Sequence, residues 1–292
     1  MNITTNGNLK LAVQKKGRLT DKSIELLKLC GIDIENYAER LVVSSSSFPL
    51  DLLLLRDDDI PEYVQDGVAD IGIVGENVIV EKKARVETLQ KLGFGKCKIM
   101  LAAPESRQFE TLQDINNKTI ATSYPNILQS FLNENNLKAK TIEISGSVEI
   151  APALGVADLI CDIVSTGTTL MMNKLKKSFT VYESQAALIC SDLLLKDEKK
   201  NEILTELLRR IRSVLTARSS KYLMMNVPID ALEKIEKLIP SIKSPTIVPL
   251  ADPNMVAVHA VIPSDLLWKI VDQLKQEGAS GILLLPIENM IL

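Results

Sequence analysis

In the first part of the chain, stretches whose hydrophobic pattern is typical of strands alternate with stretches whose hydrophobic positions recur at helical spacing. Three stretches have the alternation or the short apolar run that is typical of strands, at residues 9–13, 50–55 and 71–74. Between the first two, apolar side chains recur at helical spacing in residues 20–30, with Asp21 suited to cap the first turn and Gly31 to end the last. A second helix has Pro61 in its first turn and ends at Gly67. Strands that alternate with helices predict a parallel α/β sheet.

A four-residue motif, Gly-Val-Ala-Asp, occurs twice, at residues 67–70 and 155–158. Each copy follows a predicted helix and precedes an apolar strand. Two interpretations stay open: two similar helix-to-strand turns, or two α/β lobes of related topology with a cleft between them. In the second interpretation the second lobe opens near residues 119–122 and closes near Lys177. The apolar stretch 182–190 then returns the chain to the first lobe.

The last quarter of the chain has a different order of elements. It follows an amphipathic helix predicted at residues 197–217. Strands are predicted at residues 222–227, 246–250, 255–262 and 281–286, and helices at 229–239 and 263–277. This β-α-β-β-α-β order is that of a ferredoxin-like unit. The segment contains no nucleophile paired with a base, and its length fits a separate small domain.

Composition narrows the class of protein. The 292 residues predict about two domains. With 46% hydrophobic and 24% charged residues the chain is globular, which excludes a disordered protein. The net charge of −3 and an aromatic content of 4% argue against nucleic acid as a partner, because such sites use bulk positive charge and stacking rings.

Cysteine and histidine content argue against disulfides and zinc. The four cysteines, none in a Cys-x-x-Cys pair, stand in apolar stretches: Cys30, Cys97, Cys161 and Cys190. Buried thiols in a reducing compartment are therefore expected. The single histidine, His259, is expected to pack or bond within its strand. Residues 1–8 are polar, and no apolar run approaches the ~18 residues of a membrane span, so we expect a cytoplasmic protein without membrane contact.

The strongest chemical signal is an apolar strand, residues 159–164, that ends in small hydroxyl residues around a glycine. These residues are Ser165, Thr166, Gly167, Thr168 and Thr169. Backbone N–H groups of such a turn and of a following helix form an anion cradle. Asp162 could then reach the hydroxyls of a sugar whose phosphate sits in the cradle. The alternative is a plain strand–turn–helix with Ser/Thr caps. A P-loop is excluded, because no Gly-Lys-Ser/Thr follows.

This segment resembles the phosphoribosyl-pyrophosphate loop of the ATP phosphoribosyltransferase family. Six other segments resemble the family in the same order, the last two its long form: residues 14–19 with the family's Lys-Gly-Arg-Leu motif, 55–61, 70–77, 146–152, 244–250 and 278–283. The resemblance covers nearly the whole chain. Two departures from the family pattern are Lys174, where glycine is common, and Met255, where an aromatic is frequent.

The resemblance implies a fold and an organisation. The fold is a two-lobed, periplasmic-binding-protein-like (type II) α/β catalytic part with a C-terminal ferredoxin-like, ACT-like regulatory domain. The expected boundaries are 1–105 and 180–218 for lobe I, 106–179 for lobe II, and 219–292 for the regulatory domain. The family also implies a homo-oligomer that switches between dimer and hexamer.

The resemblance also implies the reaction. The ring nitrogen at position 1 of ATP adenine attacks the anomeric carbon of phosphoribosyl pyrophosphate, and pyrophosphate leaves, with Mg²⁺ required. This is the first step of histidine biosynthesis, with L-histidine as allosteric inhibitor. Because the nucleophile is a neutral ring nitrogen, the site needs charge stabilisation and placement of the purine more than a strong base.

Candidate residues follow from the motifs and the reaction. The cations for the phosphate groups are Lys16, Arg18 and Arg56, and the ribose or metal partners are Glu149 and Asp162. Asp158 joins the loop residues 165–169 as a phosphoribosyl-pyrophosphate contact, although it could instead cap its turn. The nucleotide contacts are Asp70, Gly72, Gly75 and Tyr124, and the histidine contacts are Thr246, Ala279 and Gly281. Each charge could otherwise be a solvated surface group, each glycine a turn, and Tyr124 a packed ring.

Two other functions remain open at this point. One is a phosphoribosyltransferase for a different base, although such enzymes commonly carry two adjacent acids before the loop, and here Ile163 follows Asp162. The other is a non-enzymatic, two-lobed nucleotide sensor. Product formation under turnover conditions separates the sensor from the enzymes.

Overall fold

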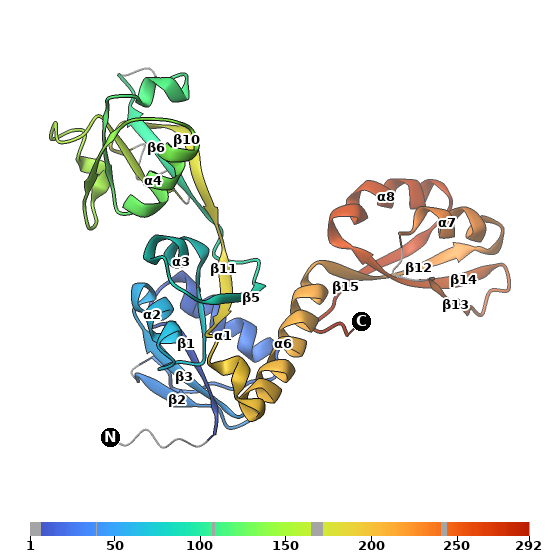
Figure 1. Ribbon diagram of the computed structural model, residues 1–292. Coiled ribbons are helices and arrows are strands. Elements are labelled where there is room, and N and C mark those ends of the chain that lie inside the picture. The colour runs from blue at the N-terminus through green and yellow to red at the C-terminus, as the bar shows by residue number, and fades with distance from the viewer. Residues whose placement is uncertain (1–6, 39, 107–108, 165–171, 241–243, 292) are drawn as a thin grey trace. The chain divides into compact units, whose positions relative to one another are not determined.

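The computed structural model describes residues 7–38, 40–106, 109–164, 172–240 and 244–291. The chain divides into two compact units, of which the first comprises Met1–Lys28 and Ile32–Leu204 and the second Leu29–Gly31 and Thr205–Leu292. Figure 1 shows the elements of both units.

The first unit contains two sheets, and the first has the order β2-β3-β1-β4-β11-β5. Its strands are β1 (Leu9–Gln14), β2 (Val42–Ser44), β3 (Leu50–Leu55), β4 (Ile71–Gly75), β5 (Glu87–Lys91) and β11 (Ala186–Cys190). Strands β3, β1 and β4 are parallel neighbours, which confirms the expected parallel α/β core. They are almost fully buried, as central parallel strands are when helices cover both faces.

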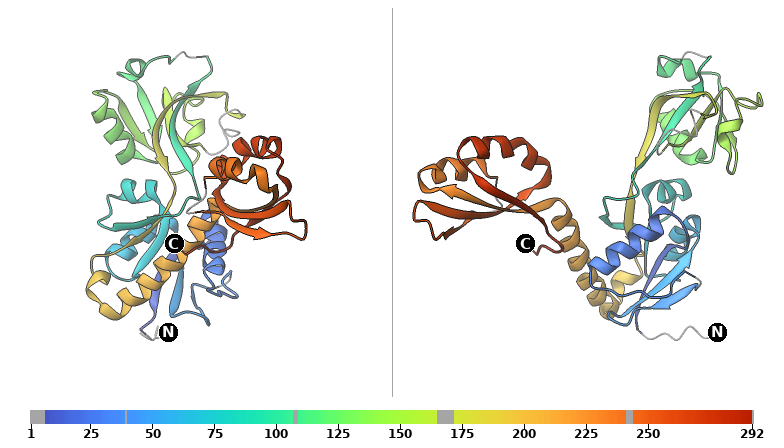
Figure 2. Two further views of the ribbon diagram at one scale, coloured as in Figure 1. Left: turned by 90° about the vertical axis from the view of Figure 1, so that its right-hand side faces the viewer. Right: turned by 180° about the vertical axis from the view of Figure 1, so that it is seen from behind.

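Helices flank the first sheet and link its strands. They are α1 (Arg18–Leu29), the short 3₁₀ turn η1 (Asp57–Asp59), α2 (Ile60–Gln65) and α3 (Glu76–Lys82). Helices α1 and α2 lie on opposite faces of the sheet (Figures 1 and 2). Ile60 and Val64 of α2 pack on Ala12 and Ile189 of the sheet, so the proline-initiated helix predicted from the sequence is confirmed.

The second sheet has the order β10-β6-β9-β7-β8. Its strands are β6 (Cys97–Pro104), β7 (Thr119–Thr122), β8 (Lys140–Glu143), β9 (Leu159–Val164) and β10 (Leu175–Ser184). Strands β8, β7 and β9 are parallel, and β6 runs antiparallel between β9 and β10. Helix α4 (Pro125–Glu134) and the turn η2 (Leu112–Ile115) cover one face, and the turn η3 (Val148–Ile150) covers the other.

The boundary between the two lobes differs from the expectation. We call the first sheet with its helices lobe I and the second lobe II. Strand β6 pairs with β9 and β10, so lobe II begins near Cys97 and not at residue 106. The single strand expected at residues 182–190 is two strands in two sheets, with the crossing at Gln185. An apolar stretch does not reveal its pairing partner, because that partner is distant in sequence.

The repeated Gly-Val-Ala-Asp motif forms the same local structure twice. Asp70 accepts a hydrogen bond from the backbone N–H of Lys10 (2.8 Å) and donates its own N–H to the Lys10 carbonyl (3.0 Å). Asp158 makes the same pair with Thr119, at 2.9 and 2.8 Å. The glycine that opens each copy has a left-handed φ, +72° and +67°. Each aspartate thus fixes the start of the neighbouring parallel strand, which supports two lobes of related topology.

The long helix α6 (Glu198–Arg218) follows β11 and the turn η4 (Leu194–Lys196). The sequence assigned the whole helix to the catalytic part, up to residue 218. In the structure its residues from Thr205 onward belong to the second compact unit. There Arg210 donates a hydrogen bond to the carbonyl of Cys30 (3.1 Å), which explains why residues 29–31 join that unit.

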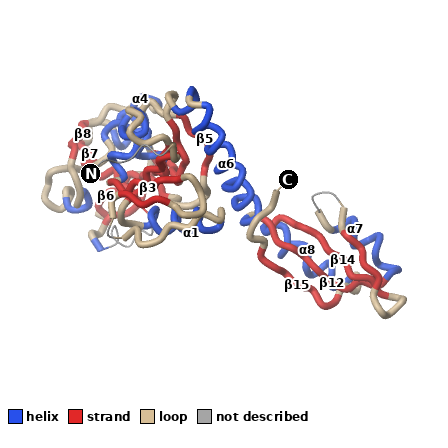
Figure 3. The backbone as a smooth tube through the Cα atoms, turned by 90° about the horizontal axis from the view of Figure 1, so that it is seen from below, coloured by secondary structure: helices blue, strands red, loops and turns tan. Residues whose placement is uncertain are grey.

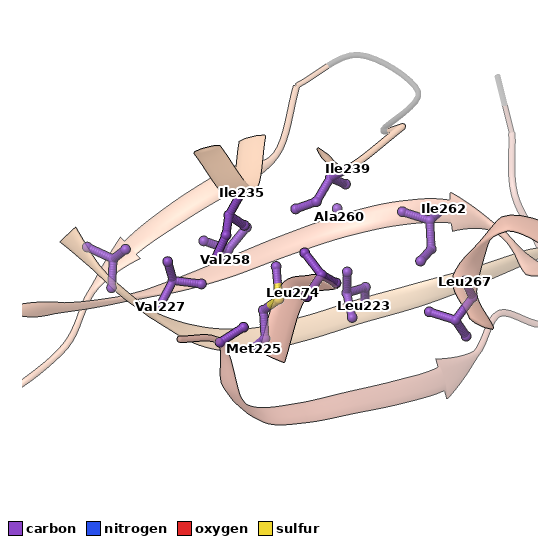
Figure 4. Packing of buried hydrophobic residues seen from close by; sticks show 12 residues of the cluster. Leu223, Met225, Val227, Ile235, Ile239, Val258, Ala260, Ile262, Leu267 and Leu274 are labelled. Atoms are coloured by element: carbon purple, nitrogen blue, oxygen red, sulfur yellow. The ribbon is translucent and has the colours of Figure 1, made fainter. Parts of the chain in front are cut away.

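The rest of the second unit is the small domain predicted from the sequence. Its elements are β12 (Ser220–Pro228), η5 (Ile229–Ala231), α7 (Leu232–Leu238), β13 (Thr246–Pro249), β14 (Met255–Pro263), α8 (Ser264–Gln276) and β15 (Ser280–Pro286). The antiparallel order β13-β14-β12-β15 is that of a ferredoxin-like fold and confirms the expectation (Figure 3). Alternate side chains of β12 and β14 pack beneath α7 and α8. Figure 4 shows Leu223 and Val258 of the strands with Ile235 of α7 and Leu274 of α8 in this core.

Candidate active site

Two loops meet at the carboxyl edge of the first sheet. The segment after β1 carries Lys16 and Arg18, and the segment after β3 carries Arg56. The backbone N–H of Lys15 donates to the carbonyl of Leu55 (2.7 Å), which holds the two segments side by side. The three predicted cations are exposed at this edge, where ligands of parallel α/β sheets bind.

Gly17 shapes the first of these loops. Its φ of +134° lies in the region that favours glycine, and an added Cβ would stand 2.8 Å from the side-chain oxygen of Gln14. The loop then turns into α1, whose Thr20 hydroxyl donates to the Gln14 carbonyl (2.7 Å). The backbone conformation therefore explains why a glycine stands between Lys16 and Arg18.

The predicted nucleotide contacts of lobe I have other partners. Gly72 is buried within β4, and a Cβ there would stand 2.7 Å from the side chain of Ile60, so this glycine lets α2 pack on the sheet. Gly75 lies at the carboxyl end of β4 beside Asn77. Asp70 stands at the opposite, amino-terminal end of β4, where it bonds to Lys10 and pairs with Lys200 at 2.8 Å. The structure therefore leaves only Gly75 of these three near the carboxyl edge.

Strands β7 and β9 bring three predicted residues of lobe II to its carboxyl edge. Asp162 lies near the end of β9, Tyr124 follows β7, and Glu149 lies in η3, on the sheet face toward which Asp162 points. Burial raises the pKa of the Asp162 carboxyl, and the nearby negative charge of Glu149 raises it further. Two carboxylates that share one side of a strand end can bind sugar hydroxyls or a hydrated cation.

Tyr124 lies where the two lobes approach one another. Burial raises its pKa, and the charges of Asp162 in lobe II and of Asp57 and Asp58 in lobe I raise it further. A cleft of about 310 Å³ lies beside it, lined by Asp58, Val78, Glu81, Lys82, Ser123, Tyr124, Pro125, Asn126 and Glu143. The carboxyl ends of β3, β7 and β8 all lead into this cleft.

A larger cleft of about 600 Å³ lies next to the end of β9, and none of its lining residues was predicted from the sequence as a site residue. It is lined by Glu76, Lys91, Lys96, Cys97, Lys98, Met100, Val164, Lys177, Glu183, Ser184 and Gln185. Its four lysines outnumber its two glutamates, which favours polyanionic ligands. Lys96 and Lys98, on either side of Cys97, were a usable signal, but the pairing of β6 with β9 was needed to place them here.

The predicted hydroxyl loop, Ser165, Thr166, Gly167, Thr168 and Thr169, lies outside the described residues. Val164 is the last described residue before it. The loop therefore leaves the carboxyl end of β9, two residues after Asp162.

The structure assigns Asp158 a structural position. It lies before the first residue of β9, about 20 Å from Val164 at the other end of that strand. Its carboxylate is bonded to Thr119. This position favours the alternative role, in which Asp158 caps its turn.

This position gives a direct test. Asp158→Asn is expected to lower the free energy of unfolding by about 1–2 kcal/mol, because a charge-assisted bond to a backbone N–H becomes weaker. The KM for phosphoribosyl pyrophosphate is expected to change by less than about twofold. Urea unfolding and steady-state kinetics check both values. A large rise in KM with unchanged stability would restore Asp158 to the binding site.

The coupling of Glu149 and Asp162 predicts a pH effect. Because the raised pKa of Asp162 keeps it protonated further toward neutral pH, kcat/KM should fall in acid as this carboxylate is lost. Glu149→Gln removes one cause of the raised pKa, so the acidic limb should move to lower pH even if the maximum rate falls. The pH profile of kcat/KM for both proteins measures this. If the acidic limb of the profile lies at the same pH in both proteins, the charge of Glu149 does not affect the titration of Asp162.

The predicted histidine contacts lie on different parts of the small sheet. Thr246 is on edge strand β13 and Gly281 on the opposite edge strand β15, three strand spacings or about 14 Å apart. Ala279 is buried in the core beneath the helices. Within one chain these residues do not form a single site. His259 was expected to pack or bond within its own strand; in the structure its Nδ1 bonds to the hydroxyl of Tyr222 (2.9 Å) on the neighbouring strand β12.

The described cysteines are free thiols. Cys30, Cys161 and Cys190 are buried, and burial raises the pKa of the Cys30 thiol to about 11. Among the described residues, no three His, Cys, Asp or Glu side chains are placed to hold a metal ion together. In the same residues we find no helix with the length and apolar character needed to cross a membrane.

The chain resembles known proteins over nearly its full length. Residues 56–213 match the family described as ATP phosphoribosyltransferase (HisG), and residues 217–289 match its C-terminal domain family. The chain belongs to the ATP phosphoribosyltransferase family. A protein of that name from Cytophaga hutchinsonii is 49% identical and aligns over 97% of this chain and 98% of its own. One from Bacteroides fragilis is 48% identical over 97% of this chain and all of its own.

Solved structures agree with this family. The ATP phosphoribosyl transferase (HisG:HisZ) complex from Thermotoga maritima contains a chain that is 29% identical, with a TM-score of 0.59 over 70% of this chain and 98% of that one. A periplasmic sulfonate-binding protein from Methylobacillus flagellatus has a TM-score of 0.50 at 13% identity over 70% of this chain and 66% of that one. The second likeness shows the fold alone and confirms the expected periplasmic-binding-protein-like architecture.

Proposed function

We propose that this protein transfers the phosphoribosyl group of phosphoribosyl pyrophosphate to the ring nitrogen at position 1 of ATP adenine and releases pyrophosphate, the first step of histidine biosynthesis. The observation that carries this proposal is the pair Glu149 and Asp162 near the carboxyl end of β9, in a chain of the ATP phosphoribosyltransferase family. Tyr124, between the carboxylates of the two lobes, is the aromatic surface on which adenine would stack.

In this reaction the main role of the site residues would be to stabilise charge. Cleavage of the anomeric bond leaves positive character on the ribose and negative charge on the departing pyrophosphate. Asp162 and Glu149 would bind ribose hydroxyls next to the positive centre. Lys16, Arg18 and Arg56 are exposed at the carboxyl edge of lobe I and would bind the phosphates. No general base is required, because the attacking nitrogen carries no proton.

The residues present fit a Mg²⁺ ion carried in with substrate. Mg²⁺ usually takes one or two carboxylates and completes its shell with phosphates and water. The coupled carboxylates of Asp162 and Glu149 supply that number of protein ligands. When bound, Mg²⁺ neutralises phosphate charge. The chain's own contribution would be to hold the ribose through Asp162 and Glu149.

A coupled assay tests the proposed reaction. Protein is mixed with ATP, phosphoribosyl pyrophosphate and Mg²⁺, with pyrophosphatase to draw the reaction forward, and the ultraviolet change of N-alkylated adenine is followed. A signal that needs both substrates supports the reaction. Well-folded protein that binds ATP but gives no signal would overturn it.

We further propose that L-histidine inhibits the enzyme through the small domain of an oligomer. Because Thr246 and Gly281 lie on opposite edges of the sheet, a site that uses both needs two copies of the chain. L-histidine is expected to inhibit the full-length protein, and Thr246→Val to weaken inhibition with kcat unchanged. Wild-type activity that is indifferent to histidine would remove this proposal. The free thiols of the described cysteines support a reducing, cytoplasmic location.

A further inference from the structure

Helix α4 begins without a cap from its own lobe. Pro125 is its first residue and has no N–H, and the residue at the N-cap, Tyr124, makes no side-chain capping bond. The hydroxyl of Ser123 donates instead to the carbonyl of Ile144. The backbone N–H groups of Asn126 and Ile127 therefore need an acceptor from elsewhere.

Glu81 of lobe I supplies that acceptor. Its Oε1 accepts the N–H of Asn126 and its Oε2 the N–H of Ile127, both at 3.0 Å. The carbonyl oxygen of Glu81 also accepts a bond from the side-chain amide of Asn126, at 2.8 Å. Glu81 lies near the end of α3, so one residue of lobe I makes three hydrogen bonds to the first turn of a helix of lobe II.

The two hydrogen bonds of the Glu81 carboxylate are stronger than those between two neutral groups. A carboxylate at a helix N-terminus interacts with the helix dipole as well as with the N–H groups. Glu81 and Asn126 are half-buried and Ile127 is buried, so water competes less for the bonds. The bonds exist only when the two lobes are in this arrangement.

The covalent connections between the lobes leave room for such an arrangement to change. The first connection, between β5 and β6, contains Gly93 and Gly95, both with positive φ. The second is Gln185, between β10 and β11. Short connections with glycines allow hinge motion, so a noncovalent contact is needed to hold the lobes at one angle.

We propose that Glu81 is a positioning residue that holds the lobes together and thereby places Tyr124 for the nucleotide. Tyr124 directly precedes the helix turn that Glu81 caps, and the same cleft is lined by Glu81, Tyr124 and Asp58. This inference rests on the proposed role of Tyr124 in ATP binding. Glu81 acts through helix α4 and makes no contact with reacting atoms.

Three full-length variants test the inference. Glu81→Gln keeps the size of the side chain but removes its charge and one acceptor. Asn126→Ala removes only the bond to the Glu81 carbonyl. Glu134→Gln, at the exposed far end of α4, is the matched control. Hydrogen–deuterium exchange of the peptide that begins α4, measured without substrates, is combined with KM and kcat for ATP.

Glu81→Gln is expected to speed exchange of the amides of residues 126 and 127 about tenfold or more. It should also raise the KM for ATP about five- to twentyfold, with kcat changed less than about threefold, because the binding-competent arrangement becomes less populated. Asn126→Ala should give a smaller change in the same direction, and Glu134→Gln no change.

Other outcomes overturn the inference. Faster exchange with an unchanged KM would make Glu81 a structural cap only. A loss of kcat with unchanged exchange would make it a direct contact of the reacting groups. The exchange measurement needs no turnover. An inactive wild type would therefore count against the proposed reaction, whereas unchanged exchange in Glu81→Gln would count against the role of Glu81.

Discussion

Asp162→Asn is expected to reduce kcat/KM for phosphoribosyl pyrophosphate about a hundredfold or more, because hydrogen bonds from ribose hydroxyls to a charged acceptor contribute about 1.5–3 kcal/mol each. The amide keeps the size of the side chain, and its oxygen can still accept the bond from the N–H of Ile163. The loss is therefore one of charge. Steady-state kinetics with each substrate varied in turn measures it.

The same variant should become more stable at neutral pH. Burial raises the pKa of Asp162 in the folded protein, so stability falls as the pH rises from the pKa of this group in the unfolded chain through its raised folded pKa, and the full cost is present at pH values above both. Asparagine carries no charge at any pH and removes this cost. Lower activity together with a higher unfolding midpoint distinguishes a lost site residue from a damaged fold. An active Asp162→Asn protein would contradict the assigned role.

Lys200→Met is expected to lower the free energy of unfolding by about 2–4 kcal/mol, because it leaves the carboxylate of Asp70 buried without its ammonium partner. The Lys200 ammonium lies 2.8 and 3.1 Å from the two carboxylate oxygens, and the Asp70 side chain is only 10% exposed. One oxygen also accepts the N–H of Lys10. Urea unfolding of the full-length protein measures the change.

The adjacent residue provides the control. Lys199→Met makes the same change of charge and size at an exposed position of α6, and little effect is expected. Asp70→Asn combined with Lys200→Met should recover part of the loss, because the uncompensated charge is gone. Equal effects of the two lysine variants would show that the ion pair adds nothing measurable.

The elements of the fold were largely predictable, and the reason is local. Strands β3 and β9 have the predicted bounds, because a short apolar run between turn residues is itself a sign of a buried strand. The repeated Gly-Val-Ala-Asp turn was visible for the same reason. The sequence did not show which sheet a strand belongs to. Residues 97–104 have the pattern of any apolar strand, and β6 belongs to the second sheet only because it pairs with β9 and β10.

The candidate site also has residues that the sequence could predict and residues that only the structure could place. Asp162, Glu149 and Tyr124, which the structure places at the carboxyl edge of lobe II, were predicted because they stand beside strand ends or motifs. The motifs also led to Asp70 and Asp158, whose true position at the amino-terminal ends of their strands follows from bonds to Lys10 and Thr119. Glu81 carried no signal, since a glutamate on a helix of mixed polarity resembles any solvated charge.

By itself, the sequence determined the strands, the helices, the βαββαβ order of the small domain and the family. These depend on period, turn residues and motifs, which are properties of neighbouring residues. Only the tertiary structure decided where the two lobes divide, that Lys200 partners Asp70, and that Glu81 caps a helix of the other lobe. Those contacts join residues 45 to 130 positions apart, and hydrogen bonds and ion pairs form between whatever groups the folded chain brings together.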